Sequence, residues 1–240
     1  MANSSKSAKG PRLGTQFRGK LAAAYGQRGV ALSSLWYVYS PRTQRDWVLK
    51  SDLEWDHFVL AEADPLITTA NYTPDAMSLE IEGEVQSVPV DAVLNYTDGH
   101  TEWREIRYAD KSPENEATNR KIKSRREAAL RIGVKYVLWT ESEVRPNVTL
   151  LANWRRVLAW MSAARERSLA PYQDELASMI KAQQSISLGN LELAVGEQGF
   201  PMYAAALFAD LQHGKYASDL ALVPLSPKTV IRTLDRSAGA

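Results

Sequence analysis

Three acidic residues are spaced so that folding could bring their carboxylates together: Glu54, Asp91 and Glu105. Asp91 and Glu105 lie in two strand-like runs joined by an Asp-Gly pair at 98–99, a strong signal for a β-hairpin. Alternation along paired strands would place both carboxylates on one face. Two carboxylates there repel each other unless a metal ion or a proton intervenes.

Such carboxylates could hold a divalent metal, because Mg²⁺ and Mn²⁺ prefer carboxylate oxygens and water. A metal so held can generate hydroxide, orient it in line with a phosphodiester and stabilise the developing negative charge. Glu54, in a helix predicted over 51–62, could complete the site through metal-bound water or a second metal. Arg107 shares a strand face with Glu105 and would add positive charge near the phosphate. The chemistry predicted is metal-dependent hydrolysis of nucleic acid.

Each of these residues also has a purely structural interpretation. Residues 51–54 (Ser-Asp-Leu-Glu) fit a capping box, in which the glutamate only bonds backbone amides at the helix start. Asp91 could be a hydrogen-bonded core carboxylate, or it could pair with Arg104 or Arg107. Glu105 could be an ordinary charge on an exposed strand face.

The overall composition is that of a globular protein. The 240 residues suit one large domain or two small ones, with 45% hydrophobic and 24% charged residues. The formal net charge of +1 says little by itself. Residues 1–30, however, contain Lys and Arg but no Asp or Glu. This basic arm could contact phosphates or be a loosely structured, solvated tail.

Several classes of protein are disfavoured. The chain has no cysteine, so disulfides and thiolate metal sites are excluded, and its three separated histidines argue against a histidine-rich zinc site. Neither a membrane-spanning apolar stretch nor a signal peptide is recognisable, which predicts a cytoplasmic protein. The sequence also has no Gly-rich phosphate loop and no nucleophile-elbow motif.

Hydrophobic periodicity predicts an α/β fold, a mixed sheet flanked by helices. Strands are expected over 35–39, 47–49, 66–72, 77–81, 88–96, 101–108 and 134–140, and helices over 51–62 and 113–132. A long helix over 147–167 precedes short helices over 172–182, 188–196 and 201–212 and strands over 220–223 and 230–234. Three small helices followed by two strands are consistent with a small winged-helix-like domain, so we place a boundary near residue 165.

The densest basic cluster lies within the helix predicted over 113–132. Its cationic residues could lie along DNA, because Lys and Arg contacts to phosphates supply most nonspecific affinity. The alternative is a solvated helix face. The candidate DNA-binding residues are Arg120, Lys121, Lys123, Arg125 and Arg126.

Taken in order, these residues resemble the restriction-endonuclease-like fold, whose signature is a Glu, an Asp and a (D/E)xK triplet. The closer resemblance is to the TnsA family, the endonuclease subunits of Tn7-like heteromeric transposases. It covers about residues 45–147, and the carboxy-terminal part also looks like the family's winged-helix domain. The segments that carry it are 51–54 (SDLE), 62–65 (EADP), 72–74 (YTP), 88–91 (VPVD), 103–107 (WREIR) and 136–145 (YVLWTESEVR).

The resemblance implies an enzyme that cuts one DNA strand at transposon ends by Mg²⁺-dependent hydrolysis and leaves the other strand to a DDE transposase. It assigns Glu54, Asp91 and Glu105 to the metal-binding catalytic set. It also implies a nuclease domain over 31–165 and a domain over 166–240 that contacts DNA or the ATPase regulator of transposition. Such a protein would work on DNA in the bacterial cytoplasm.

One departure from the family pattern concerns Arg107, which stands where the motif has lysine. Arginine supplies charge and can orient a phosphate, but it does not release its proton at neutral pH. If the motif lysine must accept a proton, Lys111 or Lys121 would have to substitute. The alternatives are a catalytically inactive DNA-binding or adaptor subunit, and a repair or junction-resolving nuclease on the same fold.

Overall fold

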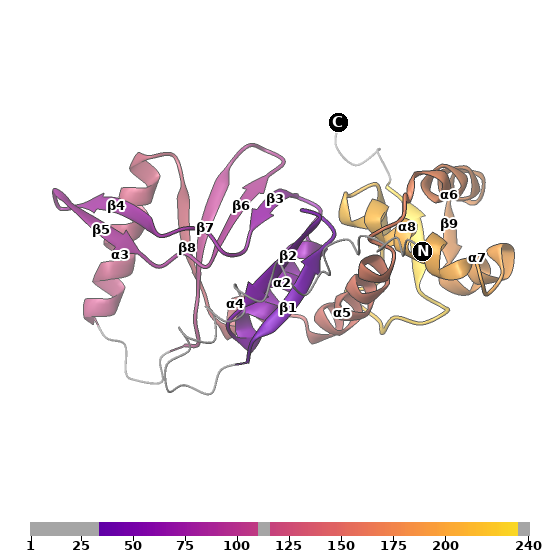
Figure 1. The fold of residues 1–240 in the computed structure, drawn as a ribbon, viewed down its shortest axis with the longest axis horizontal. Helices are drawn as coiled ribbons and strands as arrows, with labels where there is room; N and C mark the ends of the chain where they lie inside the picture. The colour runs from indigo at the N-terminus through magenta and orange to yellow at the C-terminus, as the bar shows by residue number, and fades with distance from the viewer. Residues whose placement is uncertain (1–33, 110–115, 235–240) are drawn as a thin grey trace, which may run out of the picture.

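The computed structural model describes residues 34–109 and 116–234, which form seven helices and eleven strands (Figure 1). The basic arm predicted over residues 1–30 and the candidate Lys111 lie outside the described residues. No helix in the described part is long and apolar enough to cross a membrane.

The elements follow each other in the predicted α/β order. The amino-terminal part contains β1 (Trp36–Ser40), β2 (Arg45–Leu49), α2 (Asp52–Ala63), β3 (Ile67–Asn71), β4 (Met77–Ile81), β5 (Glu84–Val88), β6 (Ala92–Tyr96), β7 (Thr101–Ile106), α3 (Glu116–Arg131) and β8 (Lys135–Trp139). The carboxy-terminal part contains α4 (Glu141–Val144), α5 (Val148–Ala163), α6 (Ala170–Gln183), β9 (Ser185–Ser187), α7 (Leu188–Val195), α8 (Phe200–Gln212), β10 (Tyr216–Ser218) and β11 (Val230–Thr233).

The central sheet is mixed and flanked by helices, as predicted. Its order is β3-β6-β7-β8, with β7 and β8 parallel and the other pairs antiparallel. Alternate residues of β7 face opposite layers: Trp103 packs in a cluster with Ala129 of α3, while Arg104 reaches His57 of α2. The two helices therefore cover opposite faces of the sheet.

The turn between β6 and β7 confirms the hairpin predicted from the Asp-Gly pair. Gly99 has φ +86°, a backbone conformation that glycine adopts without steric cost. The Asp98 side chain accepts a hydrogen bond from the His100 backbone amide at 3.1 Å. These local features set the pairing that brings residue 91 close to residue 105.

Two strand predictions were wrong. The strand expected over 88–96 begins only at Ala92, as β6, and Val88 instead ends β5, a strand that was not expected; Pro89, which has no backbone N–H to donate, lies between them. The strand expected over 220–223 is a loop, since Asn153 of α5 donates to the carbonyls of both Leu220 and Val223 at 2.8 Å. The strand of this region is β10, earlier in the chain, and the sheet order is β10-β11-β9.

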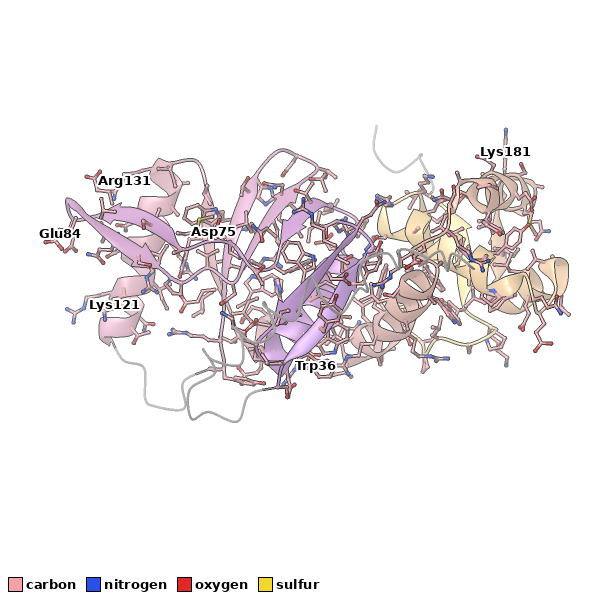
Figure 2. All side chains as sticks on the ribbon, viewed as in Figure 1. Trp36, Asp75, Glu84, Lys121, Arg131 and Lys181 are labelled. Atoms are coloured by element: carbon pink, nitrogen blue, oxygen red, sulfur yellow. The ribbon has the colours of Figure 1, made fainter. Side chains whose placement is uncertain are left out.

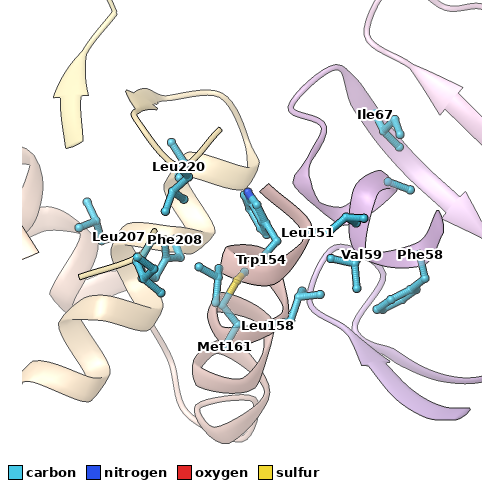
Figure 3. Packing of buried hydrophobic residues seen from close by; sticks show 14 of the residues in the cluster. Phe58, Val59, Ile67, Leu151, Trp154, Leu158, Met161, Leu207, Phe208 and Leu220 are labelled. Carbon is cyan, nitrogen blue, oxygen red and sulfur yellow. The ribbon is translucent and has the colours of Figure 1, made fainter. Parts of the chain in front are cut away.

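One hydrophobic core runs through both halves of the chain. Figure 3 shows Trp154 and Leu158 of α5 between Phe58 of α2 and Phe208 of α8, and all four side chains belong to one buried cluster. The predicted boundary near residue 165 therefore separates two parts that are packed together through α5, and each stabilises the other by sharing apolar burial.

A buried carboxylate adds a polar link between the halves. Glu62 of α2 has no exposed surface and accepts hydrogen bonds from Ser40 Oγ at 2.8 Å, Tyr72 Oη at 2.7 Å and Gln212 Nε2 at 2.7 Å. Burial, and then the neighbouring Glu62 charge, raises the pKa of Tyr72 well above its ordinary value. Its hydroxyl is therefore a donor at neutral pH.

Replacing Glu62 with alanine should lower the free energy of unfolding by about 3 kcal/mol, because three buried donors lose their acceptor. Urea denaturation followed by tryptophan fluorescence measures the change. The matched control is Glu84→Ala at the exposed tip of the β4–β5 hairpin (Figure 2), where a change below about 0.5 kcal/mol is expected. Equal effects at the two positions would contradict the structural role of Glu62.

Candidate active site

The candidate site lies where β6 begins and β7 ends. The Asp91 backbone amide donates to the Arg104 carbonyl at 2.8 Å, and its Oδ2 accepts from the Ile106 amide at 2.7 Å. Both bonds end on residues that flank Glu105. The hairpin thus brings the two acidic residues together, as the sequence predicts.

The charges of Glu54 and Asp91 interact. Burial raises the pKa of Asp91, and the negative charge of Glu105 raises it further. Burial likewise raises the pKa of Glu54, with a contribution from Asp91. Each carboxylate is therefore harder to ionise than an isolated one, which is the property of a group that a cation or a proton would stabilise.

Sequence reasoning missed Lys50, the residue before the helix cap. Its positive charge lowers the pKa of both Glu54 and Asp91, in opposition to the effect of burial. Its backbone amide also donates to Glu54 Oε2 at 2.9 Å. The only local signal was its position next to the capping motif, which says nothing about Asp91.

The capping interpretation of Glu54 is confirmed. Ser51 Oγ accepts from the Glu54 amide at 3.1 Å and donates to Glu54 Oε1 at 3.2 Å. Both carboxylate oxygens of Glu54 therefore take part in the helix start. Glu54 can cap the helix and lie near Asp91 at the same time, because the helix begins at the edge of the site.

Glu105 is buried among cationic and phenolic donors. It accepts from Tyr136 Oη at 2.5 Å and from Arg125 Nη1 at 3.2 Å, and Arg107 Nη1 lies 3.8 Å from its other oxygen. Arg107 therefore lies on the Glu105 side of the strand, as predicted. Burial and the Glu105 carboxylate raise the pKa of Tyr136, so its hydroxyl stays protonated and donates.

The predicted alternative pairing of Asp91 with Arg104 is not what the structure contains. Arg104 is buried on the other face of β7, where its Nε donates to Glu102 at 2.9 Å and its guanidinium lies 3.8 Å from the Trp139 ring centroid. It also contacts His57, whose pKa burial and the Arg104 charge hold well below the ordinary range. This network joins β7 to α2.

The candidate metal ligands fit a hard cation in type, since all three are carboxylates. In the described part of the chain, however, no three acidic or histidine side chains form a set that could hold a metal ion. Glu54 is bound to the helix cap, and Glu105 to Tyr136 and Arg125. Coordination by all three would therefore need Glu54 and Glu105 to turn away from these partners.

The predicted DNA-binding residues lie on α3, beside the site. Arg120, Lys121, Lys123 and Arg126 are exposed, and Arg125 is partly buried on Glu105. The β4–β5 hairpin packs on α3, and a groove of about 480 Å³ at their junction is lined by Arg120, Lys121 and Arg125. Arg125 therefore connects this basic face to the acidic residues at the end of β7.

Comparison of the sequence with models of known protein families gave no match, and comparison with curated proteins gave none either.

Asp91→Asn should stabilise the protein at pH 7, by the order of 1 kcal/mol. A raised carboxyl pKa means that the folded protein binds the proton more tightly than the unfolded chain does. Stability is therefore lost as the pH rises from about 3.9, the ordinary aspartate pKa, through the raised one. Asparagine does not titrate, so the variant does not suffer that loss. Its free energy of unfolding in urea, relative to that of wild type, should therefore rise as the pH increases from about 4 to about 7.

The control is Asp98→Asn in the hairpin turn. Hydrogen bonds from His100 lower the pKa of Asp98, so its charge favours folding and asparagine should not stabilise the protein at neutral pH. If the free energy of unfolding depends on pH equally in wild type and Asp91→Asn, ionisation of Asp91 does not destabilise the folded protein.

Proposed function

We propose that this chain is a Mg²⁺- or Mn²⁺-dependent DNA endonuclease, a TnsA-like subunit of a heteromeric transposase that hydrolyses a DNA strand at transposon ends. The observation that supports it best is the position of Asp91, bonded to Ile106 at the end of β7 and destabilised by the charge of Glu105. Carboxylates concentrated at a partly buried site are typical of catalytic centres. The α/β fold with a mixed, helix-flanked sheet agrees with the resemblance.

Asp91, Glu105 and Glu54 would hold the metal, after Glu54 and Glu105 turn from their present partners. A bound Mg²⁺ or Mn²⁺ would supply Lewis-acid stabilisation of the charge on the phosphate and would acidify a water. Arg107 and Lys50 hold positive charge beside the carboxylates, where it favours approach of a phosphodiester. Arg107 acts as a fixed charge in this proposal and transfers no proton.

The duplex would lie along α3. Its exposed cations can contact phosphates, and phosphate contacts position a nucleic acid without reading its sequence. Because Arg125 contacts Glu105, a strand bound in the groove beside α3 would pass close to the acidic residues. DNA binding and positioning of the scissile phosphate would thus be linked through one side chain.

Partners follow from the resemblance. A DDE transposase would cut the second strand, and residues 166–240 would contact the ATPase regulator of transposition or DNA. Leu193 of α7 and Leu222 of the loop between β10 and β11 expose 85% and 80% of their surface and offer apolar contacts for a partner. The assembly would work on DNA in the bacterial cytoplasm.

Asp91→Ala should reduce metal-dependent cleavage by about a thousandfold or more, because it removes the central carboxylate of the site. Nicking of transposon-end DNA is measured with Mg²⁺ or Mn²⁺ and the partner transposase present. Asp174→Ala, an exposed aspartate on α6 away from the hairpin, should cleave like wild type. Unchanged cleavage by Asp91→Ala would exclude this site as the active site.

Replacing Lys121 and Arg126 with alanine should weaken duplex binding and lower the slope of log affinity against log salt by about 2. Each lost phosphate contact removes about one unit of that slope. Fluorescence anisotropy of a labelled duplex at several salt concentrations measures it. Lys181→Ala is the matched control, since Lys181 is exposed on α6 at the far end of the molecule from Lys121 (Figure 2). An unchanged slope in the double variant would place the DNA elsewhere.

A second candidate function is a catalytically inactive DNA-binding or adaptor subunit. It is favoured by Arg107 in the motif lysine position and by the engagement of Glu54 and Glu105 with protein donors. The two functions differ in one observable. A chain that binds transposon-end DNA but leaves it intact with Mn²⁺ and the partner transposase is the adaptor.

A further inference from the structure

A second hollow opens beside the candidate active site, at the first turn of α2. It measures about 660 Å³, and α2 contributes Asp52, Trp55 and Asp56 to its lining. These residues share one helix face, while Glu54 is turned by about 100° from Trp55. The hollow and the acidic site are therefore neighbouring sides of the same helical turn.

Two tryptophans form a fixed aromatic platform in this hollow. Trp36 of β1 stacks on Trp55 with ring centroids 5.2 Å apart and an interplanar angle of 13°, and Trp55 stacks on Phe58 in turn. The Trp36 indole N–H donates to Asp52 Oδ1 at 2.8 Å. Trp36 lies at the edge of the molecule (Figure 2) and is 36% exposed, so a held ring still offers surface to a ligand.

Two arginines complete the hollow. Arg145 Nε donates to Asp56 Oδ2 at 2.6 Å, and Arg155 Nη2 bonds the other oxygen of the same buried carboxylate. Their side chains remain 35% and 45% exposed. A guanidinium has five N–H donors, so each arginine is oriented by Asp56 and still has donors for a ligand.

The hollow is also tied to the strand that carries Glu105. After the Asp56 hydrogen bond, a side-chain hydrogen bond from Arg145 to Tyr108 is among the contacts that raise the pKa of Arg145. Tyr108 follows Arg107 in the chain. One wall of the hollow is therefore positioned by the same segment as the acidic site.

We propose that this hollow binds an unpaired nucleotide of the DNA strand at the candidate active site, with its base stacked on Trp36 and its phosphate facing Arg145 and Arg155. The proposal rests on the proposed function, because it takes DNA as the ligand. Aromatic side chains beside cationic groups bind single strands by base stacking and phosphate contacts.

The formal charges of the hollow indicate whether attraction of the phosphate or stacking of the base dominates binding. Asp52 and Asp56 formally cancel the two arginines, and Asp52 is occupied by the Trp36 indole. Long-range attraction of phosphate is therefore weak, and stacking supplies most of the affinity. Binding here should depend less on salt than binding along α3 does.

The test is a titration of the full-length chain with an octathymidylate, following the indole N–H resonances of its seven tryptophans by NMR. The Trp36 resonance, assigned from its loss in Trp36→Phe, should shift, while that of Trp160 in α5 should not. Trp36→Ala should weaken binding about tenfold or more, since a base stacked on an aromatic ring contributes on that scale. Tyr37→Ala, the exposed aromatic on the opposite face of β1, is the matched control and should bind like wild type.

Three results would overturn the proposal: no response of Trp36, equal affinity of Trp36→Ala and wild type, or equal binding of a base-free sugar–phosphate oligomer. A titration of Asp91→Ala separates it from the proposed function, because this variant should lose cleavage and keep octathymidylate binding. If wild type never cuts DNA while Trp36→Ala loses octathymidylate binding, the nucleotide site stands and the nuclease function is refuted.

Discussion

Burial of polar residues on helix α2 is the constraint on which the rest of the structure depends. Asp56, His57 and Glu62 are all at most 4% exposed, and a buried charge or dipole without a partner destabilises the fold by several kcal/mol, on the order of 3 to 5. Each residue finds its partner in a different part of the chain. Asp56 binds the arginines before and within α5, His57 binds Arg104 of β7, and Glu62 binds Ser40, Tyr72 and Gln212. One helix thereby fixes the sheet, the first hairpin and the carboxy-terminal helices relative to one another.

The acidic site inherits its position from this arrangement. The first turn of α2 carries Glu54, and the contact of His57 with Arg104 holds β7 against the same helix. The β6–β7 hairpin then brings Asp91 close to Glu105, whose negative charge adds to burial in raising the pKa of Asp91. Carboxylates whose ionisation is disfavoured by burial and by neighbouring charge are common where a protein binds or transforms a ligand. The same turn of α2 presents the Trp36–Trp55 platform on its adjacent side, so two sites of different chemistry share one support.

Helix α5 packs the two halves of the chain against each other. Its apolar residues pack on α2 and α8 at once, and Asn153 holds the loop before β11 by three hydrogen bonds. The carboxy-terminal helices are thus joined to α2 through the packed side chains of α5.

The sequence alone determined the features that short-range chemistry encodes. The Asp-Gly turn set the β6–β7 hairpin and the meeting of Asp91 with Glu105, and the Ser-Asp-Leu-Glu run set the start of α2. Periodicity predicted most helices and the mixed sheet, but not β5, β9, β10 or the short helix α4. The tertiary structure decided which distant residues meet. Asn153 turned a strand-like apolar run into a loop, Arg104 paired with Glu102 rather than Asp91, and Lys50 came to face two carboxylates. Such choices depend on which buried donors and acceptors remain to be satisfied after packing, and no window of neighbouring residues contains that information.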